Sequence, residues 1–220
     1  EPLLYPHIEE LLARIKQTGW FEDISMTTNG SLLAPRAAKL KELGLNRVNI
    51  SLDSLDSDAF ALCVGKANQL DSVLNGIQSA IDAGFTSVKI NTVLSRHWTD
   101  DEVHDLLTYV ETWPVIWRFI EYMPFQGDAF HGPTFDEWKA QLERVSGGIL
   151  TENHDVYGFG PATYYNLPSG KEIGFIFSMS HSYCDTCNRV RLTSDGQMRL
   201  CLLRDDEADL VSRVRRGLSE

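Results

Sequence analysis

Three cysteines in the last quarter of the chain carry the clearest chemical pattern in the sequence. Cys184 and Cys187 lie three positions apart, and Cys201 follows after thirteen further residues. Two thiolates at that spacing can bind one metal centre from a single turn, and the third returns from a separate segment. Two readings stay open: a structural zinc site that takes a fourth ligand such as His181, or a 4Fe–4S cluster that three thiolates hold with one iron open.

Two arginines lie directly beside these cysteines. Arg189 and Arg191 flank Val190, and on an extended strand residues two apart share a face. Paired guanidiniums beside a metal centre favour an anionic ligand, and phosphate is the usual one. The whole chain carries 20 basic and 31 acidic side chains, for a net charge of −11. That balance argues against general nucleic-acid binding and against an anionic membrane, because a polyanion would be repelled.

The composition fits a globular protein of one or two domains, because 43% of the 220 residues are hydrophobic. We find no signal peptide and no apolar run of ~18 residues, which predicts a cytoplasmic, reducing setting where clustered cysteines favour metal over disulfide. The fourth cysteine, Cys63, lies in the apolar stretch 60–64, and we expect a buried, inert thiol. The chain begins at Glu1 rather than methionine and ends at Glu220 without an obvious stop, so we expect a piece of a longer protein.

The first half of the chain alternates helical and strand patterns. Apolar residues at helical spacing and capping residues predict the helices, and short β-rich runs predict the strands. The expected helices are 6–18, 32–43, 57–64, 71–83 and 99–111, and the expected strands are 23–28, 47–53, 87–93 and 117–123. This β-α repetition predicts an α/β protein with a parallel sheet, open or closed into a barrel.

In each expected strand, apolar residues alternate with polar ones. A parallel strand buried on both faces would be nearly all apolar, so one face lies under the helices and the other is polar. Thr27, Ser51 and Lys89 fall on the polar face, whereas the alternation does not place Met123. Polar faces that point to a common interior predict a barrel with a wet, ligand-filled lumen. An antiparallel sheet facing solvent is the alternative, and the long helical connections count against it.

The pattern changes after Met123. Thr134 and Glu137 form a capping box for a further helix. Shorter strands are expected at 149–151, 163–167 and 172–178. We expect a domain boundary after residue 125, with the barrel in 1–125 and a small α+β domain that carries the cysteines in 126–220.

Five segments, taken together in this order, resemble one family. They are Thr27–Gly30, Val48–Leu55, Val88–Val93, Arg118–Pro124 and Cys184–Leu192. They resemble molybdenum cofactor biosynthesis protein A, the GTP 3′,8-cyclase family of radical S-adenosylmethionine enzymes. The resemblance covers nearly the whole chain. It implies a partial (incomplete) TIM-type barrel followed by a small α+β C-terminal domain that carries an iron–sulfur cluster.

The resemblance also implies a reaction. In this family one 4Fe–4S cluster in the barrel cleaves S-adenosylmethionine to a radical, and a second cluster, held by three cysteines, binds GTP through its open iron. The radical takes the ribose 3′ hydrogen, and the carbon radical attacks C8 of guanine. After uptake of one electron and one proton, the cyclised product is (8S)-3′,8-cyclo-7,8-dihydroguanosine 5′-triphosphate. The pathway partner, cyclic pyranopterin monophosphate synthase (protein C), makes the molybdopterin precursor from it. A homodimer stays open.

The resemblance assigns roles to individual residues of this chain and leaves the catalytic residues unknown. The matched ligands of the second cluster are Cys184, Cys187 and Cys201. The matched GTP contacts are Thr27, Lys89, Arg189, Val190 and Arg191. The matched S-adenosylmethionine contacts are Ser51 and Met123.

The sequence departs from the family at both ends. The N-terminal Cys-x-x-x-Cys-x-x-Cys motif, which binds the radical-generating cluster, is absent, and only Glu1 and Pro2 remain of a Gly-Gly-Glu-Pro stretch. The C-terminal tail with its terminal glycines is also absent. We therefore expect a fragment that is inactive alone. Two alternatives stay open: another radical S-adenosylmethionine enzyme with an auxiliary cluster, and a non-catalytic zinc- or nucleotide-binding domain.

Overall fold

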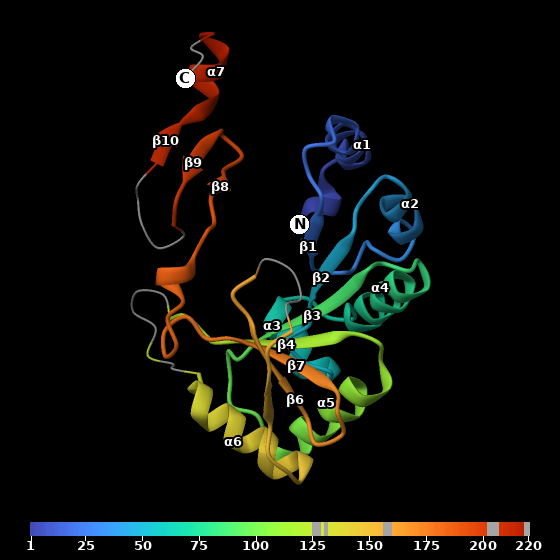
Figure 1. The fold of residues 1–220 in the computed structure, drawn as a ribbon. Helices are drawn as coiled ribbons and strands as arrows, with labels where there is room; N and C mark the ends of the chain where they lie inside the picture. Colours follow the sequence, from blue (N-terminus) through green and yellow to red (C-terminus); the bar gives the residue numbers. More distant parts are fainter. Residues whose placement is uncertain (125–128, 130–131, 156–159, 202–206, 218–220) are drawn as a thin grey trace. The chain divides into compact units, whose positions relative to one another are not determined.

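The chain forms two compact units, Glu1–His181 and Ser182–Glu220 (Figure 1). The structure is a computed structural model. It describes residues 1–220 except 125–128, 130–131, 156–159, 202–206 and 218–220.

The first unit is built on a seven-stranded sheet in the order β1-β2-β3-β4-β7-β6-β5. Its parallel strands are β1 (Ser25–Thr28), β2 (Arg47–Ser51), β3 (Ser87–Val93), β4 (Ile116–Ile120) and β7 (Glu172–Ile176). An antiparallel edge is added by β6 (Thr163–Asn166) and β5 (Thr151–Asn153). The expected α/β class and parallel sheet are confirmed. The sheet is open, because among the described residues β1 and β5 form its two edges.

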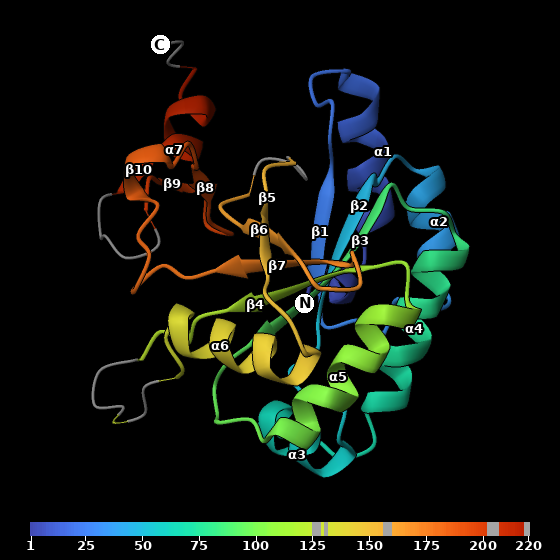
Figure 2. The ribbon, with the colours of Figure 1, turned by 60° about the horizontal axis from the view of Figure 1, so that its bottom comes forward.

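Helices connect the parallel strands. They are η1 (Pro2–Leu4), α1 (Ile8–Thr18), α2 (Ala37–Glu42), α3 (Ser57–Val64), α4 (Leu70–Asp82), α5 (Asp100–Thr112) and α6 (Phe135–Ser146). Figure 2 shows α1, α2, α4 and α5 along one face of the sheet. Thr99 and Thr134 cap α5 and α6 in capping boxes with Glu102 and Glu137, as the sequence predicts for α6.

The sheet face under the helices is the hydrophobic core. Val48 and Ile50 of β2 and Val88 and Ile90 of β3 are all buried there. Burial of each such side chain contributes about 1.5–3 kcal/mol, so this apolar face fixes which way the strands turn their polar residues. The opposite face therefore has a set orientation before any ligand binds.

The segment after residue 125 joins the same sheet. β7 pairs in parallel with β4, and β6 pairs antiparallel with β7. The compact units divide after His181, whereas the domain boundary expected after residue 125 stays a prediction. Strand pairing between distant segments, which the local sequence pattern does not reveal, brings β5, β6 and β7 into this sheet.

The second unit is small and combines short strands with short helices. It contains η2 (Cys184–Thr186), β8 (Arg191–Leu192), β9 (Gln197–Arg199), β10 (Glu207–Asp209) and α7 (Leu210–Arg215). The three strands form an antiparallel sheet in the order β10-β9-β8. The β8–β9 turn requires Gly196, which has a φ of +86°, and a Cβ there would lie 2.1 Å from Val211 Cγ2.

Over the part of the chain that the structure describes, no helix combines the length and the hydropathy needed to cross a bilayer.

Candidate functional site

The polar face of the sheet brings together side chains from successive strands. Thr27, Asn49 and Lys89 stand directly opposite one another on β1, β2 and β3. Two residues further on, Ser51 stands opposite Asn91. The prediction that Thr27, Ser51 and Lys89 share a face is therefore confirmed.

A buried arginine links three of these strands. Arg118 on β4 is 7% exposed, and its Nε donates to Asn91 Oδ1 at 2.9 Å. Its Nη2 donates to Asn49 Oδ1 at 2.8 Å. Gly174 on β7 makes room for it, because a Cβ there would lie 2.8 Å from Arg118 Cγ. A buried charge needs such partners, and amide oxygens satisfy the guanidinium without neutralising it.

Lys89 is the most buried charged side chain of this face, at 1% exposure. Its Nζ donates to the hydroxyl of Tyr164 on β6 at 3.3 Å and lies 5.7 Å from the centre of that ring. Burial lowers the pKa of Lys89 to about 8, and the charges of Arg118 and Arg47 add to the effect. This concentration of positive charge on a polar face suits an anionic ligand.

Arg47 contributes less to that positive charge, because it is paired. Its Nε donates to Asp23 Oδ1 at 2.8 Å, and a second guanidinium nitrogen contacts the other carboxylate oxygen. The hydrogen bond from Arg47 lowers the pKa of Asp23. Lys89 and Arg118 are therefore the cations of this face that we associate with a ligand.

The carboxyl edge of the sheet carries the two residues matched to S-adenosylmethionine. Ser51 ends β2 and is half-buried, and Met123 follows the end of β4. Ser178 Oγ donates to Met123 Sδ at 3.2 Å. Since β2 and β4 belong to the same set of parallel strands, their carboxyl ends lie at the same edge, where α/β barrels build their sites.

Glu121, next to this edge, holds the last segment of the first unit. It is buried, and its carboxylate accepts the backbone N–H of Met179 at 2.6 Å and that of Ser180 at 3.1 Å. Both residues precede the junction at His181. Glu121 therefore fixes the path by which the chain leaves the sheet towards the cysteines.

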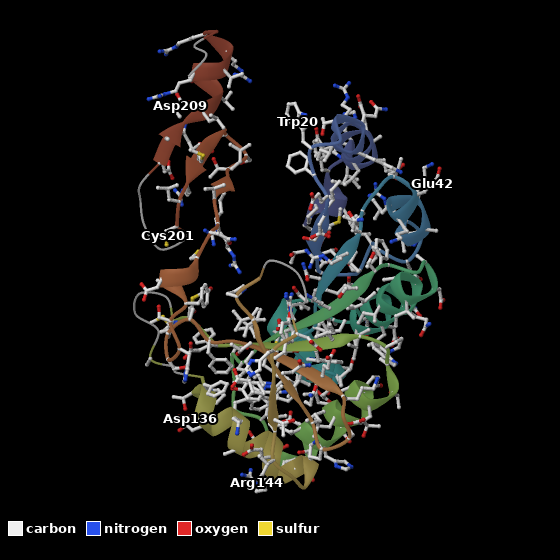
Figure 3. The ribbon with its side chains drawn as sticks, in the orientation of Figure 1. Trp20, Glu42, Asp136, Arg144, Cys201 and Asp209 are labelled. Carbon is white, nitrogen blue, oxygen red and sulfur yellow. The ribbon has the colours of Figure 1, made fainter. Side chains whose placement is uncertain are left out.

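The cysteines lie in the second unit. Cys184 begins η2 and Cys187 directly follows it; both are exposed, and Cys187 N donates to Cys184 O at 3.2 Å. Half-buried Cys201 follows β9 (Figure 3). Thiolates are the ligands of iron–sulfur clusters, so this donor set fits a 4Fe–4S cluster in kind. Among the described residues, however, no three His, Cys, Asp or Glu side chains gather into a metal site. The structure brings two of the three donors onto one turn.

The arginines follow the cysteines on extended chain. Arg189 is half-buried, with its guanidinium 5.7 Å from the Tyr183 ring centre, and Val190 is exposed. Arg191 is half-buried at the start of β8. The guanidiniums thus lie in the same compact unit as all three thiols.

Cys63 and His181 are the two other residues that the sequence analysis interpreted. Cys63 is exposed, so the prediction of a buried thiol is wrong: α3 buries Phe60 and turns Leu62 and Cys63 outward. His181, the suggested fourth zinc ligand, packs its ring 4.7 Å from that of Phe135 in the first unit.

Comparison with known proteins gives two family matches and a set of close relatives. Residues 1–110 match the Radical SAM superfamily, and residues 115–220 match Molybdenum Cofactor Synthesis C. GTP 3′,8-cyclase of Trichodesmium erythraeum is 44% identical over 228 residues, which cover all of this chain and 68% of the relative. The cyclase of Heliobacterium modesticaldum is 40% identical, with the same coverage.

Solved structures agree with the fold. Streptococcus suis SuiB bound to S-adenosylmethionine has a TM-score of 0.65 at 13% identity and covers 97% of this chain and 52% of its own. A domain of pyruvate-formate lyase-activating enzyme from Bacteroides vulgatus has a TM-score of 0.51 at 18% identity, over 67% of this chain and 89% of its own.

The parallel sheet with its polar face is thus that of a radical S-adenosylmethionine protein. Within that class, identity of 40% or more to cyclases over the whole length shows that the chain belongs to the GTP 3′,8-cyclase family. Family membership brings S-adenosylmethionine and an iron–sulfur cluster with it.

Sequence reasoning missed several residues that the structure places around Lys89. Alternation placed Asn49 and Asn91 on the polar face but grouped Arg118 with Ile120, against Glu121. The structure puts Arg118 opposite Asn91, on the polar face. A polar strand residue has no visible role until its partners are known. Tyr164 gave no signal, because its strand lies 75 positions from Lys89.

Proposed function

We propose that this chain is the part of a GTP 3′,8-cyclase that binds GTP and S-adenosylmethionine in molybdenum cofactor biosynthesis. The buried pair of cations Lys89 and Arg118 is the observation that carries this proposal, in a chain 44% identical to a cyclase. The reaction removes a hydrogen atom from the ribose C3′ and forms the C3′–C8 bond. When bound, S-adenosylmethionine and its cluster supply the radical that takes this hydrogen.

The residues divide the work of binding. Lys89 and Arg118 offset the negative charge of the phosphates. The free-energy cost of burying these two cations is already compensated in the folded chain by packing and by contacts to amide oxygens. Thr27 offers a hydroxyl on the same sheet face. Arg189 and Arg191 would pair with the triphosphate, with Val190 between them. Geometry of this kind orients the ribose and guanine for the bond that forms.

Other residues would hold the cofactors. Cys184, Cys187 and Cys201 are the proposed ligands of an auxiliary 4Fe–4S cluster, and its remaining iron would bind GTP. Ser51 and Met123 are the proposed contacts to S-adenosylmethionine. The product would pass to cyclic pyranopterin monophosphate synthase in the cytoplasm, and a homodimer is compatible with the proposal.

The first test is anaerobic reconstitution of the chain with iron and sulfide. We expect about four irons per chain and an EPR spectrum that GTP changes. Stoichiometric zinc, or a cluster spectrum that does not respond to GTP, would contradict the proposal. In the Arg189→Ala variant we expect weaker GTP binding with unchanged iron content.

The second test addresses turnover. Residues 1–220 would replace the matching 68% of the Trichodesmium cyclase. The hybrid is expected to convert GTP to the 3′,8-cyclised nucleotide, detected by mass spectrometry, and to leave ATP unchanged. A hybrid that cleaves S-adenosylmethionine but spares GTP would favour another radical enzyme with an auxiliary cluster.

A further inference from the structure

The second unit places two arginines directly opposite each other. Arg191 on β8 pairs with Arg199 on β9, and Arg199 pairs in turn with Glu207 on β10. Side chains that stand directly opposite on neighbouring strands share a face, with Cβ atoms about 4.5–5.5 Å apart. Like charges in that position destabilise a sheet. This row holds two guanidiniums and one carboxylate, and Asp209, two residues along β10, adds a second carboxylate to the same face.

The hydrogen-bonding capacity of these arginines is only partly used. Arg199 forms an ion pair with Glu207, yet its Nε is buried and has no hydrogen-bond partner among the described residues. Within that same set, no ion pair to Arg191 is present. A guanidinium offers five N–H donors in a planar fork that matches a phosphate group. The row therefore has donors to spare for an anion.

We infer that Arg199 joins Arg191 in binding the phosphate chain of the nucleotide, and that Glu207 competes with phosphate for Arg199. This inference rests on the proposed GTP site and adds a residue that sets its preference for three phosphates. When phosphate is bound, a phosphate oxygen takes the place of the Glu207 carboxylate beside the Arg199 guanidinium. Without phosphate, the Glu207 carboxylate limits repulsion between the two guanidiniums.

Opposite effects on binding distinguish this role from a structural one. In the reconstituted chain, Arg199→Gln is expected to weaken GTP binding about tenfold, as for the loss of one charge-assisted hydrogen bond, and to change GMP binding less than about twofold. Glu207→Gln is expected to tighten GTP binding about threefold, because it removes the competing carboxylate. Arg213→Gln is the control for Arg199→Gln, because it removes the same charge from an exposed arginine on α7.

The measurements are isothermal titration with GTP and GMP, with iron content and melting temperature recorded for each variant. Equal weakening by Arg199→Gln and Glu207→Gln would show a structural ion pair and overturn the inference. The inference would also be overturned if Arg199→Gln and Glu207→Gln both left GTP affinity unchanged while Arg189→Ala weakened it. Wild-type chain that does not bind GTP at all would instead overturn the proposed function.

Discussion

The two units hold their candidate residues in opposite ways. In the first, Lys89 and Arg118 are 1% and 7% exposed within a sheet that has a large hydrophobic core. In the second, Cys184 and Cys187 are exposed, and among the described residues no hydrophobic side chain after Phe177 is buried. The first site is preorganised by packing. The described residues of the second unit show no buried core, and units below about 40 residues usually need disulfides, metals or oligomerisation.

This comparison suggests that a cluster does structural work in the second unit. Chain folding around a metal site gains its stability from the ligand bonds when burial is small. In the first unit, by contrast, ligands meet an arrangement that exists already. The following predictions test this division, from the largest expected effect to the smallest.

Loss of the cluster should affect one unit only. We expect Cys184→Ser with Cys187→Ser to lower iron from about four to below one per chain. Amide exchange should then become fast in β8 and β9, since the proposed cluster would be the main constraint there, while exchange in β2 and β3 stays slow. Hydrogen–deuterium exchange with mass spectrometry measures both.

Cys63→Ser is the matched control, because this thiol is exposed in the first unit. It should leave iron and exchange unchanged. Slow exchange in the second unit without iron would contradict the comparison.

The pH dependence of GTP binding should report on Lys89 in the first unit. Its pKa is about 8, so the ammonium is charged below that value and loses its proton as pH rises. Phosphate prefers the charged form, so GTP affinity should fall by up to about tenfold per pH unit above pH 8. Titration calorimetry between pH 7 and about 9.5 checks this.

The stability of the chain should change with pH in the opposite direction to GTP affinity. The folded-state pKa of Lys89 is lowered from 10.5 to about 8, so the unfolded chain binds more protons between these values. The contribution of Lys89 to the free energy of unfolding therefore rises with pH across that window. Lys89→Met should remove both dependences. A variant with an unchanged binding profile would show that another group titrates.

The smallest effect is expected at Glu121. Oε2 of Glu121 accepts from the backbone N–H groups of both Met179 and Ser180, and Oε1 also accepts from that of Ser180. Glu121→Gln removes the negative charge from these hydrogen bonds. Hydrogen bonds to a neutral acceptor are weaker by about 1 kcal/mol, so the melting temperature should fall by about 2–4 °C. Exchange at these two amides should also accelerate. Glu22→Gln, at an exposed residue outside the helices and strands, serves as the control and should change neither.

Much of the first unit could be predicted from local pattern. The β-α repetition predicted the parallel strands β1 to β4, and period-two alternation placed Thr27, Ser51 and Lys89 on one face. Alternation works because neighbouring side chains in a strand point to opposite faces and one face must be buried. The same reasoning failed for Cys63, because an apolar run in a short helix does not say which side packs.

The pairing of strands from distant segments could not be predicted from local pattern. Tyr164 reaches Lys89 only because β6 and β7 extend the sheet beside β4. The opposition of Arg191, Arg199 and Glu207 likewise depends on the register of three short strands. Neither register nor strand order follows from the residues of one strand alone.

The sequence by itself determined the α/β class, the polar strand face, and the cysteine and arginine pattern that resembles GTP 3′,8-cyclases. Those features are local or depend on residue type and spacing. Only the tertiary structure decided that β5, β6 and β7 complete the sheet and that Arg118 and Tyr164 lie near Lys89. It also decided that the cysteines lie in a unit whose described residues form no buried core. These outcomes depend on which distant surfaces are buried against each other, and burial is a property of the folded chain.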